Sequence, residues 1–233
     1  MSINGGNFAE FEQAAAGSWS MSDSQRSARQ LGTHQHLFFE GDKRTHVFIV
    51  ESGWVKLYRT LIDGQRQVVG FCNGGSILGL EGGDDHINSC ESVTAVKVRS
   101  IPIGRLAELF VRDPGLASQL LRQMGRQLGA AQAQLTTLGA QSAEQKLASF
   151  LLSFASYSAS EDDEFDLPMR RTEMGEFLGL RLETVSRKMS EFQRRKWIRM
   201  ASLYRCRILN RDALENLSEG GEVEDAGLGR LPH

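Results

Sequence analysis

Four side chains of different chemistry lie close together in a basic stretch near the C-terminus, namely Leu182, Glu183, Ser186 and Arg187. Their spacing places them on one face of a helix, close to its N-terminal end. Arg187 can donate two hydrogen bonds to guanine O6 and N7, Glu183 can accept one from a cytosine or adenine amino group, and Leu182 can pack on a thymine methyl group. The pattern predicts contacts to base edges in the major groove of DNA.

Two short helices must position these side chains. Apolar residues recur at helical spacing on both sides of a turn formed by Gly179 and Leu180. They are Met174, Phe177 and Leu178 before the turn and Val185, Met189 and Phe192 after it. Two helices joined by a glycine-containing turn form a helix-turn-helix. The alternative is an ordinary helical hairpin with a solvated basic face.

The segment after the second helix is expected to form a β-hairpin. Residues 197–200 and 205–209 alternate in polarity, which makes the unit a winged helix-turn-helix. Arg199, Arg205 and Arg207 would then face phosphates, which add affinity but carry no sequence information.

The distribution of charge supports a polyanionic partner. The 233-residue chain has a formal net charge of −2, but residues 167–211 hold 12 basic and 4 acidic side chains, a local charge of +8. One basic module on an otherwise acidic chain indicates one unit that binds nucleic acid. No apolar run is long enough for a membrane span, and three scattered cysteines do not make a disulfide framework. We therefore expect a cytoplasmic protein with no membrane partner.

The N-terminal half has a different sequence pattern. Short apolar runs recur at 36–39, 46–50, 54–58, 67–71, 77–80 and 95–101, and glycine-containing turns separate them. Short strands at regular spacing predict a small β-barrel or β-roll. The glycine pairs could instead hold a phosphate, but neither a P-loop nor a dinucleotide-binding signature is present.

A long helix is expected between the two halves, opening at Asp113 and Pro114. Its apolar residues alternate at steps of three and four, as in an a/d seam of about three heptads. The seam consists of Leu121, Met124, Leu128, Ala131, Leu135 and Leu138. A narrow apolar seam favours pairing with a second copy across a symmetry axis, and packing on the helix's own domain is the alternative. We expect a homodimer that forms without a ligand.

The order of these elements and the sequence from Leu178 to Arg187 resemble the CRP/FNR superfamily of bacterial transcription regulators. Glu183, Ser186 and Arg187 look like the FNR/FixK branch, because CRP-like members usually have Arg in place of Leu182 and Gly in place of Ser186. The resemblance covers roughly residues 30–216. It implies an activator that recruits RNA polymerase at a palindrome close to TTGAT-N4-ATCAA in double-stranded DNA, with one half-site per subunit.

The expected fold is α+β, with an N-terminal β-roll (a double-stranded β-helix, cupin-like), a long dimerisation helix and a C-terminal winged helix-turn-helix. The expected boundaries are 1–29 for a poorly ordered lead-in, 30–112 for the β-roll, 113–140 for the dimerisation helix, 141–216 for the DNA-binding domain and 217–233 for a disordered tail.

Two arginines occupy positions where the family often has Ser or Thr. Arg170 and Arg181 fall at the N-caps of the two motif helices. Arginine cannot accept a capping hydrogen bond, so both are expected to contact phosphates instead. The full set of expected phosphate contacts is Arg170, Arg171, Arg181, Lys188, Arg199, Arg205 and Arg207.

The resemblance implies three possible ligands for the β-roll, and the residues favour none of them. An iron–sulfur cluster usually requires four thiolates, and the chain has only Cys72, Cys90 and Cys206. Cyclic-nucleotide binders carry a Gly-Glu pair where this chain has Gly79-Leu80, and an Arg-Ser pair of which the Arg is missing. The histidines that a haem could use are His34, His36, His46 and His86. A metal at Asp84, Asp85, His86 and Cys90 has suitable ligand types, but a polar loop is the simpler interpretation.

We therefore expect a regulator that is active without cofactor or metal. Gating by an unidentified ligand such as haem or a nucleotide is the main alternative. A more remote alternative is an enzyme that uses Cys72 or Cys90 with His86.

Two further sites are hypotheses. The turn at Ile62, Asp63, Gly64, Gln65 and Arg66 resembles a polymerase-activating loop of the family. Cys206 lies between Arg205 and Arg207, which could lower its pKa and make it a redox-sensitive residue in the wing. A buried wing cysteine is the alternative.

Overall fold

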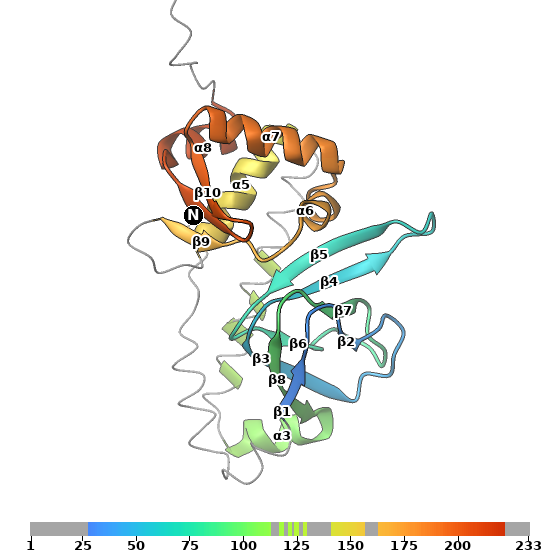
Figure 1. The fold of residues 1–233 in the computed structure, drawn as a ribbon. Helices are drawn as coiled ribbons and strands as arrows, with labels where there is room; N and C mark the ends of the chain where they lie inside the picture. Colours follow the sequence, from blue (N-terminus) through green and yellow to red (C-terminus); the bar gives the residue numbers. More distant parts are fainter. Residues whose placement is uncertain are drawn as a thin grey trace, which may run out of the picture.

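The computed structural model describes residues 28–112, 117–118, 121–122, 124–125, 128–129, 141–156 and 163–221 (Figure 1). The predictions on most of the lead-in, on the helix start at Asp113 and Pro114, and on the tail from residue 222 lie outside these residues. The described part forms two units, a β-roll and a winged helical domain, that lie against each other (Figure 1). None of its helices is long and apolar enough to cross a membrane.

Two antiparallel four-stranded sheets make the β-roll. The first has the order β1-β8-β3-β6 and the second the order β2-β7-β4-β5. The strands are β1 (Ala28–Leu31), β2 (His36–Phe38), β3 (His46–Ser52), β4 (Val55–Thr60), β5 (Arg66–Cys72), β6 (Ile77–Leu78), β7 (Ser89–Ser92) and β8 (Val96–Pro102). Strand β1 pairs with β8 from Ala28 onward, two residues before the expected start of the β-roll at residue 30.

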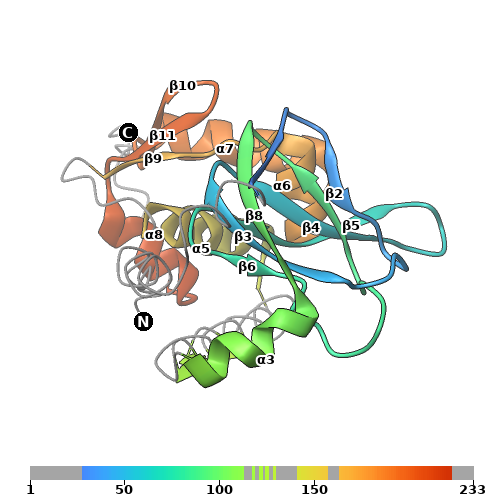
Figure 2. The ribbon, with the colours of Figure 1, turned by 90° about the horizontal axis from the view of Figure 1, so that it is seen from below.

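The alternation of side chains along β3 shows how the roll is packed. Phe48 and Val50 lie in the core between the two sheets. Val47 and Ile49 point to the opposite face and pack against helix α3 (Ile103–Arg112), which lies beneath the roll (Figure 2). A strand buried on both faces has a continuous apolar run, which here is residues 47–50.

The C-terminal unit is the predicted winged helix-turn-helix. Its helices are α5 (Ala143–Ala155), α6 (Arg171–Leu178), α7 (Leu182–Arg194) and α8 (Arg211–Ser218). Its strands β9 (Glu164–Asp166), β10 (Ile198–Ser202) and β11 (Arg205–Ile208) pair in the order β10-β11-β9. Helix α8 continues to Ser218, so the domain ends later than the expected residue 216 and the tail begins later than 217.

Three residues of the predicted seam fall in the described part. Leu121, Met124 and Leu128 are helical, with 69%, 41% and 61% of their surface exposed. Ala131, Leu135 and Leu138 lie outside the described residues. The dimer therefore stays a prediction that three exposed apolar side chains support.

Aromatic side chains join the two units. Phe71 of β5 lies 5.6 Å from Phe177 of α6 and 5.9 Å from Phe154 of α5, measured between ring centroids. Trp54, which precedes β4, stacks on Phe154 at 5.2 Å. The hairpin of β4 and β5 extends alongside α6 (Figure 1), so the β-roll contacts the helix-turn-helix directly.

Candidate nucleic-acid interface

Two glycines shape the turn of the helix-turn-helix. Gly179 ends α6 in the left-handed region at φ 65°, which costs a residue with a side chain about 1–2 kcal/mol. Gly175, one turn earlier, accepts a hydrogen bond from Leu180 N–H at 2.9 Å. A Cβ atom at Gly175 would lie 2.5 Å from the carbonyl oxygen of Leu180, so only glycine lets the chain cross so close to α6.

Helix α7 has one buried face and one exposed face. Val185, Met189 and Phe192 are buried in the core of the domain, together with Met174 and Leu178 of α6. The predicted apolar stripes are therefore confirmed, with Phe177 only partly buried. Since one face of α7 is fixed in the core, its opposite face is held rigidly at the surface.

The four predicted base-contacting residues all lie on that opposite face. Leu182, Glu183, Ser186 and Arg187 are exposed in the first two turns of α7. Within the described part of the chain, no hydrogen bond or ion pair is seen for Glu183 or Arg187. Their polar groups are therefore available to a ligand, and α7 is rigid enough to present them together.

The predicted phosphate contacts fall into two groups. Arg181, at the N-cap of α7, and Arg199, in β10, are exposed, and among the described residues neither forms an ion pair. Arg181 makes no side-chain capping bond, as the sequence predicted. A cation at a helix N-terminus faces the positive end of the helix dipole, which is unfavourable unless an anion lies between them. Arg181 thus fits a phosphate contact.

Other basic side chains of the set are already paired. Lys188 donates to Glu144 of α5 and to Glu191 at 2.9 Å, and the bond to Glu144 is the main reason why its pKa is raised. Arg170 contacts His34 of the β-roll at 3.0 Å through Nη2. In this structure both point to protein partners, so the expectation that they contact phosphates is not supported.

The remaining three arginines differ in their surroundings. Arg171 is half-buried and donates to the Met174 sulfur, and burial lowers its pKa. Arg205 is exposed but binds Glu164 at 3.0 Å, and Arg207 is half-buried in β11. Strand β9, which the sequence analysis missed, thus brings an acidic residue against the wing.

Cys206 does not have the reactivity that its neighbours suggested. Its side chain is fully buried in the core of the winged domain, because side chains alternate along β11 and those of Arg205 and Arg207 point elsewhere. Burial raises its pKa to about 12. Cys206 is thus a buried wing cysteine, the alternative named above, and its burial argues against the redox hypothesis.

The candidate polymerase loop is the tip of the β4–β5 hairpin. Ile62 is fully exposed there, and Asp63 Oδ1 accepts a hydrogen bond from Gln65 N–H at 3.0 Å. Gly64 has a positive φ of 80°. Arg66 differs from the other four, because it begins strand β5, where it pairs with Thr60, and its side chain lies over the ring of Tyr58 and contacts Glu91 at 3.4 Å.

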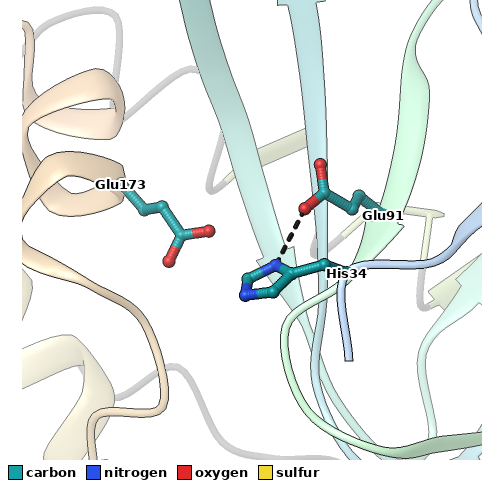
Figure 3. A group of neighbouring side chains, drawn as sticks. All are labelled: His34, Glu91 and Glu173. Carbon is teal, nitrogen blue, oxygen red and sulfur yellow. Dashed lines mark hydrogen bonds and ion pairs between the residues drawn. The ribbon is translucent and has the colours of Figure 1, made fainter. Parts of the chain in front are cut away.

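The metal ligands that the sequence offered, Asp84, Asp85, His86 and Cys90, do not form one site. His86 is buried and stacks on Phe38 at 3.7 Å, whereas Asp84 and Asp85 are exposed and Asp85 pairs with Lys43. In the described ranges, one other group has suitable donors within 4.8 Å of one another: His34, Glu91 and Glu173 (Figure 3).

A resident cation already occupies the centre of that group. Lys56 Nζ lies 2.6 Å from Glu173 and 3.2 Å from Glu91. An ammonium so close to both carboxylates offsets part of their negative charge, takes the place a metal ion would need and would repel it. These residues therefore form an ion cluster rather than a metal site, and no motif or spacing predicts it, because its members are far apart in the sequence.

A β-roll joined to a winged helix-turn-helix with an exposed polar recognition face defines a DNA-binding regulator. The chain matches the cyclic nucleotide-binding domain family over residues 28–113 and the Crp-like helix-turn-helix domain family over residues 145–217. It is 34% identical over 178 residues to the transcriptional activator protein FnrA of Stutzerimonas stutzeri, covering 74% of this chain and 73% of that protein. It is 30% identical over 189 residues to the fumarate and nitrate reduction regulatory protein of Escherichia coli K12, covering 79% and 75%.

A solved structure is also similar to this chain. FixK2 from Bradyrhizobium japonicum has a TM-score of 0.76 and 29% identity, covering 82% of this chain and 96% of that one. The chain belongs to the CRP/FNR family of transcription regulators, as the sequence resemblance indicated. The relatives are regulators, which rejects the alternative of a cysteine–histidine enzyme. Burial also raises the pKa of the Cys72 thiol to about 11 and that of Cys90 well above its ordinary value.

Replacing Arg181 by serine should weaken binding to all DNA sequences about equally. The change removes one phosphate contact, and the serine adds a side-chain cap to α7 that keeps the helix stable. We expect the slope of log K against log salt to fall by about one unit per subunit. Binding titrations at several salt concentrations on specific and scrambled DNA test this. A loss confined to one base position would contradict it.

Proposed function

We propose that the protein is a homodimeric transcriptional activator that binds a TTGAT-N4-ATCAA-like palindrome, recruits RNA polymerase and needs no cofactor. The observation that carries the proposal is the exposed face of α7, where Glu183, Ser186 and Arg187 are held together with no partner seen among the described residues. Leu182 adds an apolar contact for thymine methyl groups. Because its proposed target is bacterial DNA, we place the protein in the cytoplasm.

The base preferences follow from these side chains. Arg187 matches the guanine of each TTGAT half-site, because a guanidinium can donate to both O6 and N7. Glu183 matches an amino group of adenine or cytosine on the opposite strand. The exposed seam residues Leu121, Met124 and Leu128 support pairing of two copies, which would place two α7 helices about one helical turn of DNA apart.

The β4–β5 hairpin supports the contact with RNA polymerase. Its tip carries the fully exposed Ile62 beside Asp63 and lies at the end of a hairpin that extends from the β-roll (Figure 1). An isoleucine exposed beside a carboxylate offers a partner both an apolar and a charged contact. Arg66 does not belong to this proposed surface, because it faces Glu91.

A gel shift with purified, untreated protein in air tests the proposal. We expect specific binding to TTGAT-N4-ATCAA in the nanomolar range, at least about a thousandfold tighter than to a scrambled duplex. Cyclic AMP should change neither value. Light scattering at micromolar concentration should give the mass of a dimer. A monomer, or equal affinity for both duplexes, would contradict the proposal.

Gating by a small ligand is the second candidate, and one observation favours it. In the part of the chain described, Glu81 Oε2 and His86 Nδ1 are buried polar atoms without a hydrogen-bond partner. Both lie in the β-roll, where Nδ1 of His86 is 3.7 Å from Glu81 Oε1. Buried unpaired polar atoms are costly, so a polar ligand that hydrogen-bonded to both would be stabilised. Specific DNA binding that begins only on addition of a ligand would favour this candidate.

A further inference from the structure

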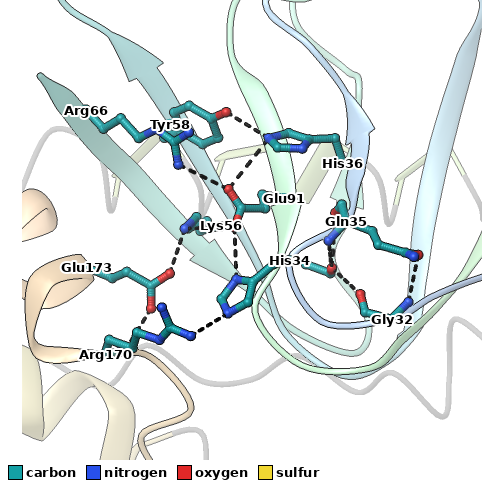
Figure 4. A network of polar contacts seen from close by, with 11 residues as sticks. Gly32, His34, Gln35, His36, Lys56, Tyr58, Arg66, Glu91, Arg170 and Glu173 are labelled. Carbon is teal, nitrogen blue, oxygen red and sulfur yellow. Dashed lines mark hydrogen bonds and ion pairs between the residues drawn. The ribbon is translucent and has the colours of Figure 1, made fainter. Parts of the chain in front are cut away.

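A buried ion cluster crosses the boundary between the β-roll and the helix-turn-helix (Figure 4). We define it as Lys56, Glu91 and Glu173 with His34 and Arg170. Lys56 is in β4 and Glu91 in β7, whereas Glu173 is in the first turn of α6. Lys56, Glu91 and Glu173 are 4%, 5% and 5% exposed. Charged residues are almost never buried so deeply unless they are paired. The three side chains are therefore treated as one ionic unit.

Lys56 is the bridge within the cluster. Its ammonium donates to Glu173 at 2.6 Å on one side and lies 3.2 Å from Glu91 on the other. Glu173 Oε2 meanwhile accepts the backbone N–H of Arg170 at 2.7 Å, which caps the start of α6. One carboxylate therefore joins the N-terminus of the helix-turn-helix to a lysine that belongs to the β-roll.

His34 extends the cluster to the side chain of Arg170. Arginine can only donate hydrogen bonds, so the Nε2 atom of His34 must be the acceptor in its 3.0 Å contact with Arg170. The proton of a neutral His34 then lies on Nδ1, which donates to Glu91 at 3.1 Å. Both ends of the ring are satisfied, one by each unit of the protein.

Other contacts also join the β-roll to α6. Gln67 of β5 donates through its side-chain amide to the backbone oxygen of Glu176 in α6, at 2.5 Å. Together with the ring contacts of Phe71 and Phe177, this fixes α6 against the β4–β5 hairpin. Polar contacts are directional whereas apolar ones are not, so the ion cluster is the part of the interface that specifies one orientation.

We propose that Lys56 is a positioning residue for DNA recognition, a built-in cation that holds the helix-turn-helix in one orientation against the β-roll. Orientation matters because a dimer must present two α7 helices at the spacing of its two half-sites. Lys56 touches no DNA and acts through Glu173 and α6. Measuring the preference for half-site spacing rests on the proposed function, whereas measuring hydrogen–deuterium exchange without DNA does not.

Glu173→Gln tests the proposal with the least disturbance. Glutamine still accepts the N–H of Arg170 but loses the charge that Lys56 binds. Lys56→Met removes the cation itself. The matched control is Glu176→Gln, the same change in the same helix. Its carboxylate lies near Lys56 and has no hydrogen-bond partner among the described residues.

The first readout is hydrogen–deuterium exchange without DNA. Both cluster variants should exchange about tenfold faster than wild type in the segments that contain β5 and α6, while α7 keeps its protection in the domain core. Glu176→Gln should match wild type. Unchanged exchange in Glu173→Gln would overturn the proposal, and this variant stays informative if Lys56→Met fails to fold.

The second readout is selectivity for half-site spacing. Wild type should prefer the four-base-pair spacer by about tenfold over spacers changed by two base pairs, and the cluster variants should lose most of that preference. A purely structural role would lower affinity for all spacers alike, which would also overturn the proposal. If wild type itself shows no preference, the palindrome is wrong, and the exchange data still decide the role of Lys56.

Discussion

Arg187→Ala should abolish most of the sequence specificity of DNA binding. A bidentate contact between arginine and guanine contributes about 1–3 kcal/mol per half-site, so a dimer should lose about 2–6 kcal/mol, at least about thirtyfold in Kd. Arg187 is exposed in the second turn of α7, on a helix whose other face is fixed by Val185 and Met189. The truncation should therefore leave the fold intact, and circular dichroism checks this.

A base substitution provides the second half of the test for Arg187. Replacing the guanine in both half-sites should weaken wild type strongly but should barely affect Arg187→Ala, because the contact is already lost. The control is Arg199→Ala, which removes an exposed arginine of the wing. It should weaken binding modestly and equally for both duplexes. Additive losses from the protein and DNA changes would show that Arg187 does not contact this guanine.

The recognition unit was predictable because its local signals agree. A helical apolar stripe, a glycine turn and a polar face all occur within about thirty residues, and each depends on neighbours in the sequence. Val185, Met189 and Phe192 are buried as their spacing required. The β-roll was predictable for the same reason, since apolar runs and glycine turns mark β3, β4 and β5.

The missed strands lack that local signal. Strand β7 has the sequence Ser-Cys-Glu-Ser and is buried throughout, although three of its four side chains are polar. Those side chains are satisfied by partners far away in the sequence: Ser92 by Gly32 and Gln35, and Glu91 by His34 and Lys56. A polar strand becomes a core strand only through such tertiary bonds, which no periodicity shows.

The same limit explains why several basic residues were misplaced. Arg170 and Lys188 have the right residue type for phosphate contacts, but their partners His34 and Glu144 come from other elements. Cys206 has two basic neighbours in sequence, yet alternation along β11 directs it into the core. Residue type and sequence neighbours predict chemistry only where the side chain reaches the surface.

Lys56→Met should destabilise the protein by about 3–5 kcal/mol, the cost of removing one partner from a buried ion pair. Methionine fills a similar volume, so the loss comes from Glu91 and Glu173, which remain buried with their shared cation gone. Chemical denaturation followed by tryptophan fluorescence measures the change, because Trp54 lies at the interface between the two units.

Lys43→Met is the matched control for this effect, because it makes the same substitution in the same domain. Lys43 pairs with Asp85 at 2.7 Å, but both side chains are largely exposed, so water replaces the lost partner at little cost. Adding Glu173→Gln to Lys56→Met should recover part of the stability, since Glu173 has no other ion pair among the described residues, whereas Glu91 keeps Arg66. If Lys56→Met were no more destabilising than Lys43→Met, the ion cluster would not hold the two units together, and the aromatic contacts of Phe71 would have to carry the interface alone.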